Sequence, residues 1–189
     1  TIFALSNGAR IFDKEGNVIV NSPEMKEVLQ FYKDLGEYSA PGHTYWQQAR
    51  ELFLAGKTPM MFYSTYIMDD LALAEIQTQY ISNFDPELVE NTEFAPMMTH
   101  SRSSSFGQVL SLAVIKSSEN KLDVLKFLDF VFEPDNYIKY IHMAPGGMLP
   151  TRSSIAESEE FLNDPKGIYR RYGAEKIKSI IYGMENIEK

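Results

Sequence analysis

The sequence contains no cysteine among its 189 residues. This absence excludes disulfide frameworks, cysteine-based zinc sites and thiol catalysis. No run of about 18 apolar residues is present, so the sequence predicts no transmembrane helix. Lys and Arg number 18 against 26 Asp and Glu, for a formal net charge of -8, and they nowhere cluster densely enough to neutralise a run of phosphates. We therefore expect no nucleic-acid partner.

Residue patterns for metal binding and catalysis are also missing. His43, His100 and His142 lie far apart in sequence, and none stands at ligand spacing from another histidine or from a carboxylate on one helix face. The adjacent pairs Asp69-Asp70 and Glu159-Glu160 point to different faces of a helix, so neither makes an acid and base pair by itself. We interpret both pairs as solvated. The sequence predicts no metal site, no cofactor and no enzymatic activity.

What is present is a globular composition with alternating strand and helix patterns. Apolar residues make up 44% and aromatic residues 13%, enough to bury a core. Helix starts are indicated by Ser22 and Pro23, and a helix stop by Gly56. The predicted strands cover 17–20, 60–63, 94–96 and 108–115. The predicted helices cover 23–35, 45–54, 66–74, 121–133, 135–143, 155–162 and 168–182.

One strand is predicted to run directly into a helix N-terminus. Ser64 and Thr65 follow the strand 60–63 and are suited to cap the next helix. Open α/β sheets bind ligands outside the carboxyl ends of their strands, where backbone N–H groups and helix dipoles converge. This end of the strand is therefore a candidate ligand site. The later helix, 121–133, has a broad apolar surface after a predicted cap at 117–120, and we expect it to be heavily buried.

Several phrases in one order resemble family 1 extracellular solute-binding proteins, the maltodextrin-type sugar receptors of ABC importers. The resemblance covers about residues 1 to 155. The phrases are Asn7-Gly8-Ala9, Phe12-Asp13-Lys14-Glu15-Gly16, Asn21-Ser22-Pro23-Glu24, Phe53-Leu54-Ala55-Gly56-Lys57-Thr58-Pro59-Met60-Met61, Ile115-Lys116-Ser117-Ser118-Glu119-Asn120-Lys121, Phe127-Leu128 and Leu149-Pro150-Thr151-Arg152.

The resemblance implies an α/β fold of the periplasmic-binding-protein-like type II, mainly one lobe of two, in a chain that lacks the N-terminal half. Residues 1–106 would form a second-lobe segment, 107–151 a crossing strand and helices of the first lobe, and 152–189 a helical return toward the second lobe. The implied function is an extracellular or periplasmic receptor, with a lipid anchor as one option, that delivers a sugar or oligosaccharide to an ABC permease. The segment 108–150 would lack the partner strands of the first lobe, and we expect it to self-associate through unpaired strand edges and apolar helix faces.

Aromatic and hydroxyl side chains near the predicted strand end are the first group of candidate ligand contacts. Tyr66 stands where the family places an aromatic, and an aromatic face suits a pyranose ring, although core packing is the alternative. Ser64 offers a hydroxyl to a sugar, but the cap role fits it better. Trp46, with Tyr45 as its alternate, lies near a helix start, and its spacing with Ala49 and Phe53 fits core packing equally.

The second group of candidates lies in predicted loops. Gly107 permits close backbone approach and Gln108 offers a donor and an acceptor, although the family usually has a second glycine at the latter position. Gly146, Gly147 and Met148 present backbone groups and a soft side chain, or simply form a turn. Two weaker candidates complete the set: Arg152, which has a structural alternative, and Asn7, whose loop is equally interpreted as structural.

Two other functions stay open on the sequence alone. One is a sensor module, or a receptor for a solute other than a sugar. The other is a glycoside hydrolase, which needs two carboxylates about 5 to 10 Å apart in a cleft. Asp or Glu side chains facing each other beside Tyr66 would favour the hydrolase.

Overall fold

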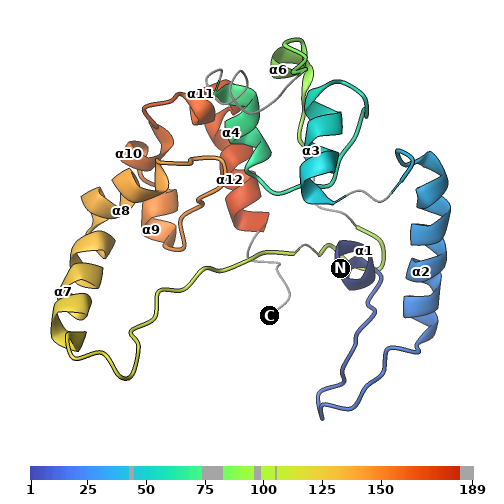
Figure 1. Ribbon diagram of the computed structural model, residues 1–189, viewed down its shortest axis with the longest axis horizontal. Coiled ribbons are helices and arrows are strands. Elements are labelled where there is room, and N and C mark those ends of the chain that lie inside the picture. Colours follow the sequence, from blue (N-terminus) through green and yellow to red (C-terminus); the bar gives the residue numbers. More distant parts are fainter. Residues whose placement is uncertain (43–44, 74–82, 96–98, 105, 184–189) are drawn as a thin grey trace. The chain divides into compact units, whose positions relative to one another are not determined.

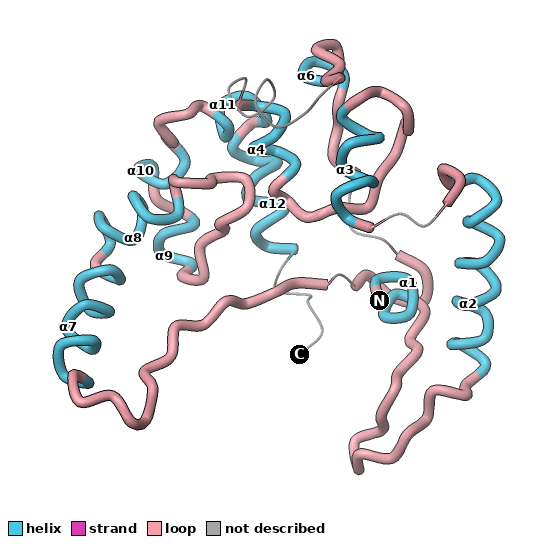
Figure 2. The backbone as a smooth tube through the Cα atoms, viewed as in Figure 1, coloured by secondary structure: helices cyan, strands magenta, loops and turns pink. Residues whose placement is uncertain are grey.

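The computed structural model describes residues 1–42, 45–73, 83–95, 99–104 and 106–183. These residues form helices and loops (Figure 2), without a named strand in the described ranges. The chain divides into two compact units, which are described separately. Unit 1 comprises Thr1–Thr44, Glu93–Gln108 and Tyr182–Lys189, and unit 2 comprises Tyr45–Thr92 and Val109–Ile181.

Unit 1 is built on a contact between two helices, α1 (Ile2–Ser6) and α2 (Pro23–Leu35), followed by the 3-10 turn η1 (Gly36–Tyr38). The start of α2 confirms the predicted cap, because the Met25 N–H donates to Ser22 Oγ at 3.2 Å. Phe3 of α1 meets Phe31 of α2 edge-on, with ring centroids 5.2 Å apart. No residue of α2 is fully buried, so its apolar side chains are only partly covered.

Unit 2 contains most of the helices drawn in Figure 1. They are α3 (Trp46–Leu54), α4 (Ile67–Ala72), α6 (Leu88–Asn91), α7 (Lys121–Phe132), α8 (Pro134–Ile141), α9 (Ser153–Ala156), α10 (Glu159–Leu162), α11 (Ile168–Tyr172) and all but the last two residues of α12 (Ala174–Gly183). The fully buried apolar side chains come mainly from α3, α4 and α8–α12 and include Leu54, Met68, Leu71, Phe161, Ile168, Tyr169 and Ile177. None of the helices in the described ranges has the length and apolar character needed to cross a membrane.

The helix predictions at 23–35, 45–54 and 135–143 are confirmed within a few residues. Gly56 follows α3 with φ of 66°, the left-handed conformation that suits a residue just past a helix end. The predicted helix 168–182 is instead two helices, because Gly173 between α11 and α12 has φ of 84°. The predicted helix 155–162 is also divided, and Ser158 caps its second part by accepting from the Phe161 N–H at 3.2 Å.

The strand predictions at 17–20, 60–63 and 108–115 are wrong for this structure. Residues 17–20 retain only an isolated antiparallel bridge between Phe12 and Val18, and the other two segments form no ladder. The last prediction, 94–96, has Pro96 outside the described residues, and positions 94 and 95 form no strand. A strand needs a neighbour that continues its backbone ladder. Around 17–20 the pairing stops after the Ile19 N–H donates to the Ile11 carbonyl and the Asp13 N–H to the Asn17 carbonyl, and 60–63 and 108–115 form no ladder with any described residue. The described residues therefore contain no β-sheet, and the α/β fold class expected from the sequence is not confirmed.

The burial predicted for the helix at 121–133 is also wrong. α7 has no fully buried residue, and Leu122 and Phe127 are 74% and 59% exposed. Its N-cap is Asn120, without a side-chain capping hydrogen bond. An amphipathic pattern predicts that the apolar face of a helix favours packing against other apolar side chains, but it does not ensure that such side chains lie nearby.

Candidate functional site

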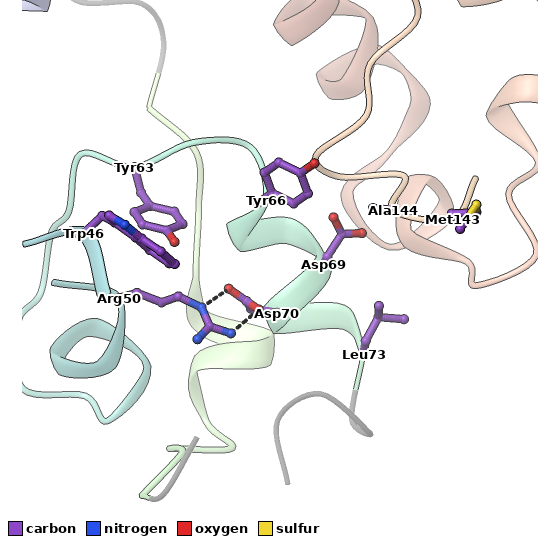
Figure 3. A pocket seen from close by; sticks show the side chains of 9 residues that line it. All are labelled: Trp46, Arg50, Tyr63, Tyr66, Asp69, Asp70, Leu73, Met143 and Ala144. Atoms are coloured by element: carbon purple, nitrogen blue, oxygen red, sulfur yellow. Dashed lines mark hydrogen bonds and ion pairs between the residues drawn. The ribbon is translucent and has the colours of Figure 1, made fainter. Parts of the chain in front are cut away.

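A pocket of about 510 Å³ lies within unit 2 (Figure 3). It is formed by α3, the segment before α4, α4 itself and the chain after α8. Aromatic and charged side chains dominate its lining. The lining residues are Trp46, Arg50, Tyr63, Tyr66, Asp69, Asp70, Leu73, Met143 and Ala144.

An ion pair between α3 and α4 forms one part of the lining. Arg50 Nε and Nη2 each donate to a carboxylate oxygen of Asp70 at 2.6 Å, a bidentate geometry. Asp70 is 7% exposed, which contradicts the expectation that it is solvated. The hydrogen bonding to Asp70 raises the pKa of Arg50. The pair therefore places two charges in the pocket that largely compensate each other.

Tyr63 lies close to this ion pair. Burial raises the pKa of its phenol, an effect that the Arg50 charge opposes and the Asp70 charge reinforces. The neutral hydroxyl is thus strongly favoured at neutral pH. A neutral phenol both donates and accepts hydrogen bonds, which suits recognition of an uncharged polar group.

The carboxylate of Asp69 faces a different direction and joins α4 to the loop after α8. Oδ1 accepts from the Gly146 N–H at 3.0 Å, and Oδ2 accepts from the Gly147 N–H at 2.9 Å. Asp69 is only 4% exposed, so the expectation of solvation is wrong here too. Burial raises the pKa of this carboxyl, and the two backbone hydrogen bonds work in the opposite direction.

The two glycines allow α4 and the loop to approach each other very closely. A Cβ at Gly146 would lie 2.9 Å from both Asp69 N and Met68 Cβ. A Cβ at Gly147 would lie 2.0, 2.1 and 2.4 Å from Tyr66 Cε1, Cδ1 and Cζ. Three adjacent ring atoms at such similar distances place that position over the face of the ring. Gly147 therefore backs one face of Tyr66 and leaves no room for a side chain.

Two further contacts hold the same loop, from Tyr169 of α11 and from Lys166 before it. The Tyr169 hydroxyl of α11 donates to the Pro145 carbonyl at 2.7 Å, in a buried environment. Lys166 Nζ donates to the Met143 carbonyl at 2.8 Å. Tyr169 is itself fixed, because its backbone N–H donates to the buried Asp164 carboxylate at 2.9 Å. The loop is thus anchored to both α4 and α11.

Four of the predicted site residues come together here. Trp46 and Tyr66 line the pocket, and Gly146 and Gly147 lie against α4 beside it. Trp46 is 49% exposed and Tyr66 is 43% exposed, so neither side chain is fully buried in the core. Met148 follows the two glycines and is half-buried.

Ser64 does not cap the helix as the sequence analysis favoured. The N-cap of α4 is Tyr66, without a side-chain capping bond, and the Ile67 N–H donates to the Ser64 carbonyl at 3.2 Å. Ser64 itself is exposed. The physical reason is that the chain makes a turn of Ser64–Ile67 before α4 begins, so that the backbone carbonyl satisfies the first N–H.

The remaining predicted residues lie elsewhere. Arg152 precedes α9 and donates from Nη1 to the Phe132 carbonyl at 2.8 Å. Gly107, Gln108 and Asn7 belong to unit 1. The Asn7 amide donates to the Glu24 carbonyl at 3.0 Å and to Glu27 Oε2 at 2.8 Å, and so joins α1 to α2.

Several residues of the pocket were not among the predicted site residues, namely Arg50, Tyr63, Leu73, Met143 and Ala144, and the roles of Asp69 and Asp70 were not predicted either. The adjacent acids in the first turn of a predicted helix were a visible signal, but their partners lie 20 and 77 residues away. In the part of the chain that the structure describes, no three His, Asp or Glu side chains gather in a way that would hold a metal ion.

Comparison with known proteins places this sequence in a family. The sequence pattern of the family described as Bacterial extracellular solute-binding protein matches residues 1–168. The chain belongs to this bacterial extracellular solute-binding protein family. The resemblance found in the sequence is confirmed at that level, while the maltodextrin type within it stays a prediction.

Relatives of the solute-binding protein agree with this assignment. YcjN of Escherichia coli (strain K12), whose name assigns it provisionally as an ABC transporter periplasmic-binding protein, is 31% identical over 155 residues, covering 81% of this chain and 33% of YcjN. A protein of Brucella abortus (strain 2308), provisionally named a binding protein, is 24% identical over 163 residues, covering 84% of this chain and 37% of the relative. The chain thus spans about a third of the length of these curated relatives.

Proposed function

We propose that this solute-binding protein is an extracellular or periplasmic receptor that binds a sugar or oligosaccharide and delivers it to an ABC permease. The observation that carries the proposal is the pocket of unit 2, which Trp46, Tyr63 and Tyr66 line together with the compensated charges of Arg50 and Asp70. Aromatic faces suit the apolar faces of sugar rings, and hydroxyl and paired charged groups suit their hydroxyls. Family membership and the provisional name of YcjN support the transport role.

The charges of the pocket favour a neutral ligand. Arg50 is engaged by Asp70, and Asp69 accepts from two backbone N–H groups. A strongly charged ligand would have to break one of these arrangements and leave a buried charge without compensation, at considerable cost. A neutral polyhydroxylated ligand adds hydrogen bonds without disrupting either one.

The carboxylates beside Tyr66 also bear on the hydrolase alternative. Asp69 and Asp70 line the same pocket, but the first is turned toward Gly146 and Gly147 and the second toward Arg50. Glycoside hydrolysis needs two carboxyl groups that flank one scissile bond. The observed arrangement therefore supports binding without chemistry, and a receptor for a non-sugar solute is the stronger alternative.

The test is a ligand screen on the natural full-length protein. Thermal unfolding and Trp46 fluorescence are followed with mono- and oligosaccharides, and with amino acids and polyamines as controls. A rise in melting temperature with one sugar class is the expected result, because a ligand that binds only the native state stabilises it. A rise in melting temperature only with an amino acid or a polyamine would show that the ligand is not a sugar. Release of nitrophenol from nitrophenyl glycosides would show that the protein is a glycoside hydrolase and not a receptor.

Variants then test whether this pocket is the binding site. Tyr66→Ala should weaken sugar binding by about tenfold or more, since stacking and burial of one aromatic ring are worth about 1.5 kcal/mol. Tyr38→Ala is the matched control, because Tyr38 is an 87% exposed tyrosine of unit 1. Equal affinities for the two variants would place the binding site elsewhere.

A further inference from the structure

The contact between α4 and the loop after α8 has a polar part and an apolar part that meet at adjacent residues. The polar part is the Asp69 carboxylate, which receives one N–H on each oxygen from consecutive residues. The apolar part is the Tyr66 ring, which lies three positions earlier and is covered on one face by Gly147. Residues three apart on a helical turn lie on the same side, so one turn of chain supplies both contacts.

This pairing determines where the Tyr66 ring can point. With Gly147 against one face, the exposed area of the ring is on the side away from the loop. The ring keeps that orientation only while the glycine stays in place. Gly147 is in turn held by the Asp69 carboxylate, and Pro145, two residues earlier, is held by Tyr169.

We infer that Asp69 is a positioning residue of the pocket, whose carboxylate holds the Gly146-Gly147 turn against α4 and thereby fixes the Tyr66 ring with one face presented to the ligand. The role in ligand binding rests on the proposed function. The role in fixing the ring does not, because it follows from contacts within unit 2. Although Asp69 lines the pocket, both of its carboxylate oxygens accept from the glycine N–H groups, so its proposed role is exerted through Gly147 and Tyr66.

The chemistry of the two N–H donors explains why a carboxylate is needed. A carboxylate offers an acceptor on both oxygens, whereas an amide offers one acceptor and one donor group. Asp69→Asn keeps the size of the side chain but directs an NH₂ group at one glycine N–H, or leaves that N–H without a partner. A buried N–H without a partner is unfavourable, so the turn should open or shift.

The first experiment needs no ligand. Full-length protein is labelled with 3-fluorotyrosine, and the Tyr66 resonance is assigned by its loss in Tyr66→Phe. In Asp69→Asn we expect the fluorine resonance of Tyr66 to shift toward the value of a solvated tyrosine and the Gly146 and Gly147 amides to exchange about tenfold faster, as expected for loss of a hydrogen bond to a charged group. Gly147→Ala should move the same resonance while leaving Asp69 in place.

Two controls separate positioning from general loss of stability. Asp123→Asn makes the same chemical change on an exposed carboxylate of α7. Ile177→Val shortens a fully buried side chain of α12 that does not line the pocket, and so lowers global stability. Neither control should alter the Tyr66 resonance or the two glycine amides. An unchanged resonance and unchanged amide exchange in Asp69→Asn would overturn the inference.

The second experiment connects the ring to binding, with maltotriose as the probe. Asp69→Asn should weaken binding about tenfold at a temperature well below unfolding, whereas Ile177→Val should not, because a stability loss alone leaves the affinity of the folded protein unchanged. Binding that is equally tight in wild type and Asp69→Asn would overturn the ligand-positioning role. If the wild type binds neither maltotriose nor the other sugars, the proposed function fails, and the ligand-free result still decides whether Asp69 fixes the ring.

Discussion

At the scale of single residues, Gly147 shows how little space the pocket wall leaves. A Cβ at this position would overlap the Tyr66 ring, with a distance of 2.0 Å to Cε1. The φ angle of Gly147 is not among the positive ones, so the constraint is space rather than backbone conformation. Replacement must therefore displace the ring or the turn.

We predict that Gly147→Ala lowers the free energy of unfolding by about 1 to 3 kcal/mol, the range for overpacking a well-packed site. Gly36→Ala is the matched control, because no atom lies within 4 Å of the Cβ position there and its φ of -60° suits alanine. That control should change stability by no more than about 1 kcal/mol, toward greater stability. Urea denaturation of both variants makes the comparison. Equal stabilities would show that the residues around Gly147 accommodate the added methyl group at little cost.

The buried carboxyl of Asp69 makes a second prediction, on pH. Burial raises its pKa from 3.8, and the neighbouring Asp70 charge acts in the same direction, whereas the Lys166 charge opposes it. Burial raises the pKa of the Tyr169 and Tyr172 phenols, and the nearby Asp69 charge adds to this effect. Because the native state binds the proton more tightly than the unfolded chain, the contribution of Asp69 to stability is present below pH 3.8 and is lost as the pH rises through its raised native pKa.

The measurement compares wild type with Asp69→Asn by denaturation at a series of values from about pH 3.5 to about pH 7, where carboxyl groups titrate. The unfolding free energy of the wild type should fall relative to that of the variant as the pH rises. A difference between the two that is constant with pH would mean that Asp69 titrates alike in the folded and unfolded states. A difference of opposite slope would mean that the two backbone hydrogen bonds outweigh the burial.

The residues of the pocket differ in how visible they are in the sequence. Trp46, Tyr66 and the Gly146-Gly147 pair were candidates because Trp46 is the single tryptophan near a helix start, Tyr66 stands where the family places an aromatic, and the two glycines form a loop that can present backbone groups. The roles of Arg50 and Asp69 could not be predicted, because each depends on a partner that folding alone brings near. Burial of an acid is a property of the packed structure, and local sequence carries no direct signal for it.

At the scale of elements, local signals predicted the start of α2 and the end of α3 correctly, but the local cap signal at Ser64 failed for α4. The start of α2 follows from Ser22 and Pro23, and the end of α3 from Gly56, because capping is decided within one turn. The predicted strands failed because a ladder requires a second strand, which a period of apolar residues does not guarantee. The predicted burial of α7 is wrong for the same reason, since an apolar helix face is buried only where other parts of the chain pack against it.

The exposed face of α7 leads to a prediction for the isolated chain. Leu122, Phe127 and Phe130 are each more than half exposed, and the extended segment before them exposes further apolar side chains. We predict that the isolated 189-residue chain self-associates, because contact between such faces removes apolar area from water. Light scattering should give a mass above that of the monomer.

Substitution on α7 shows whether this face is responsible. Leu122→Glu combined with Phe127→Glu should reduce the scattering mass toward the monomer, since charges would have to be buried at the contact. Lys121→Glu is the matched control, because it adds negative charge to the same helix without removing an apolar side chain. A monomeric mass for the unmodified chain would contradict the prediction. If Lys121→Glu lowers the mass as much as the double substitution does, the effect comes from added negative charge and not from loss of the apolar face.

At the scale of the whole molecule, the two units differ in how much apolar surface each buries. Within the described residues, the buried apolar side chains belong almost entirely to unit 2, and unit 1 contributes Ala9. Hydrophobic burial is the dominant favourable contribution to folding. The free energy that protects backbone amides from exchange should therefore be distributed unevenly along the chain.

We predict that amides of α4, α11 and α12 exchange slowest in the isolated chain, and that amides of α2 exchange much faster although α2 is the longest helix described. Length alone does not protect α2, because isolated helices of about 12 to 15 residues are marginal in water and depend on packing. Hydrogen exchange with peptide mass analysis measures both sets at once. Equal protection of α2 and α11 would show that unit 1 is stabilised by something other than burial of its own apolar side chains.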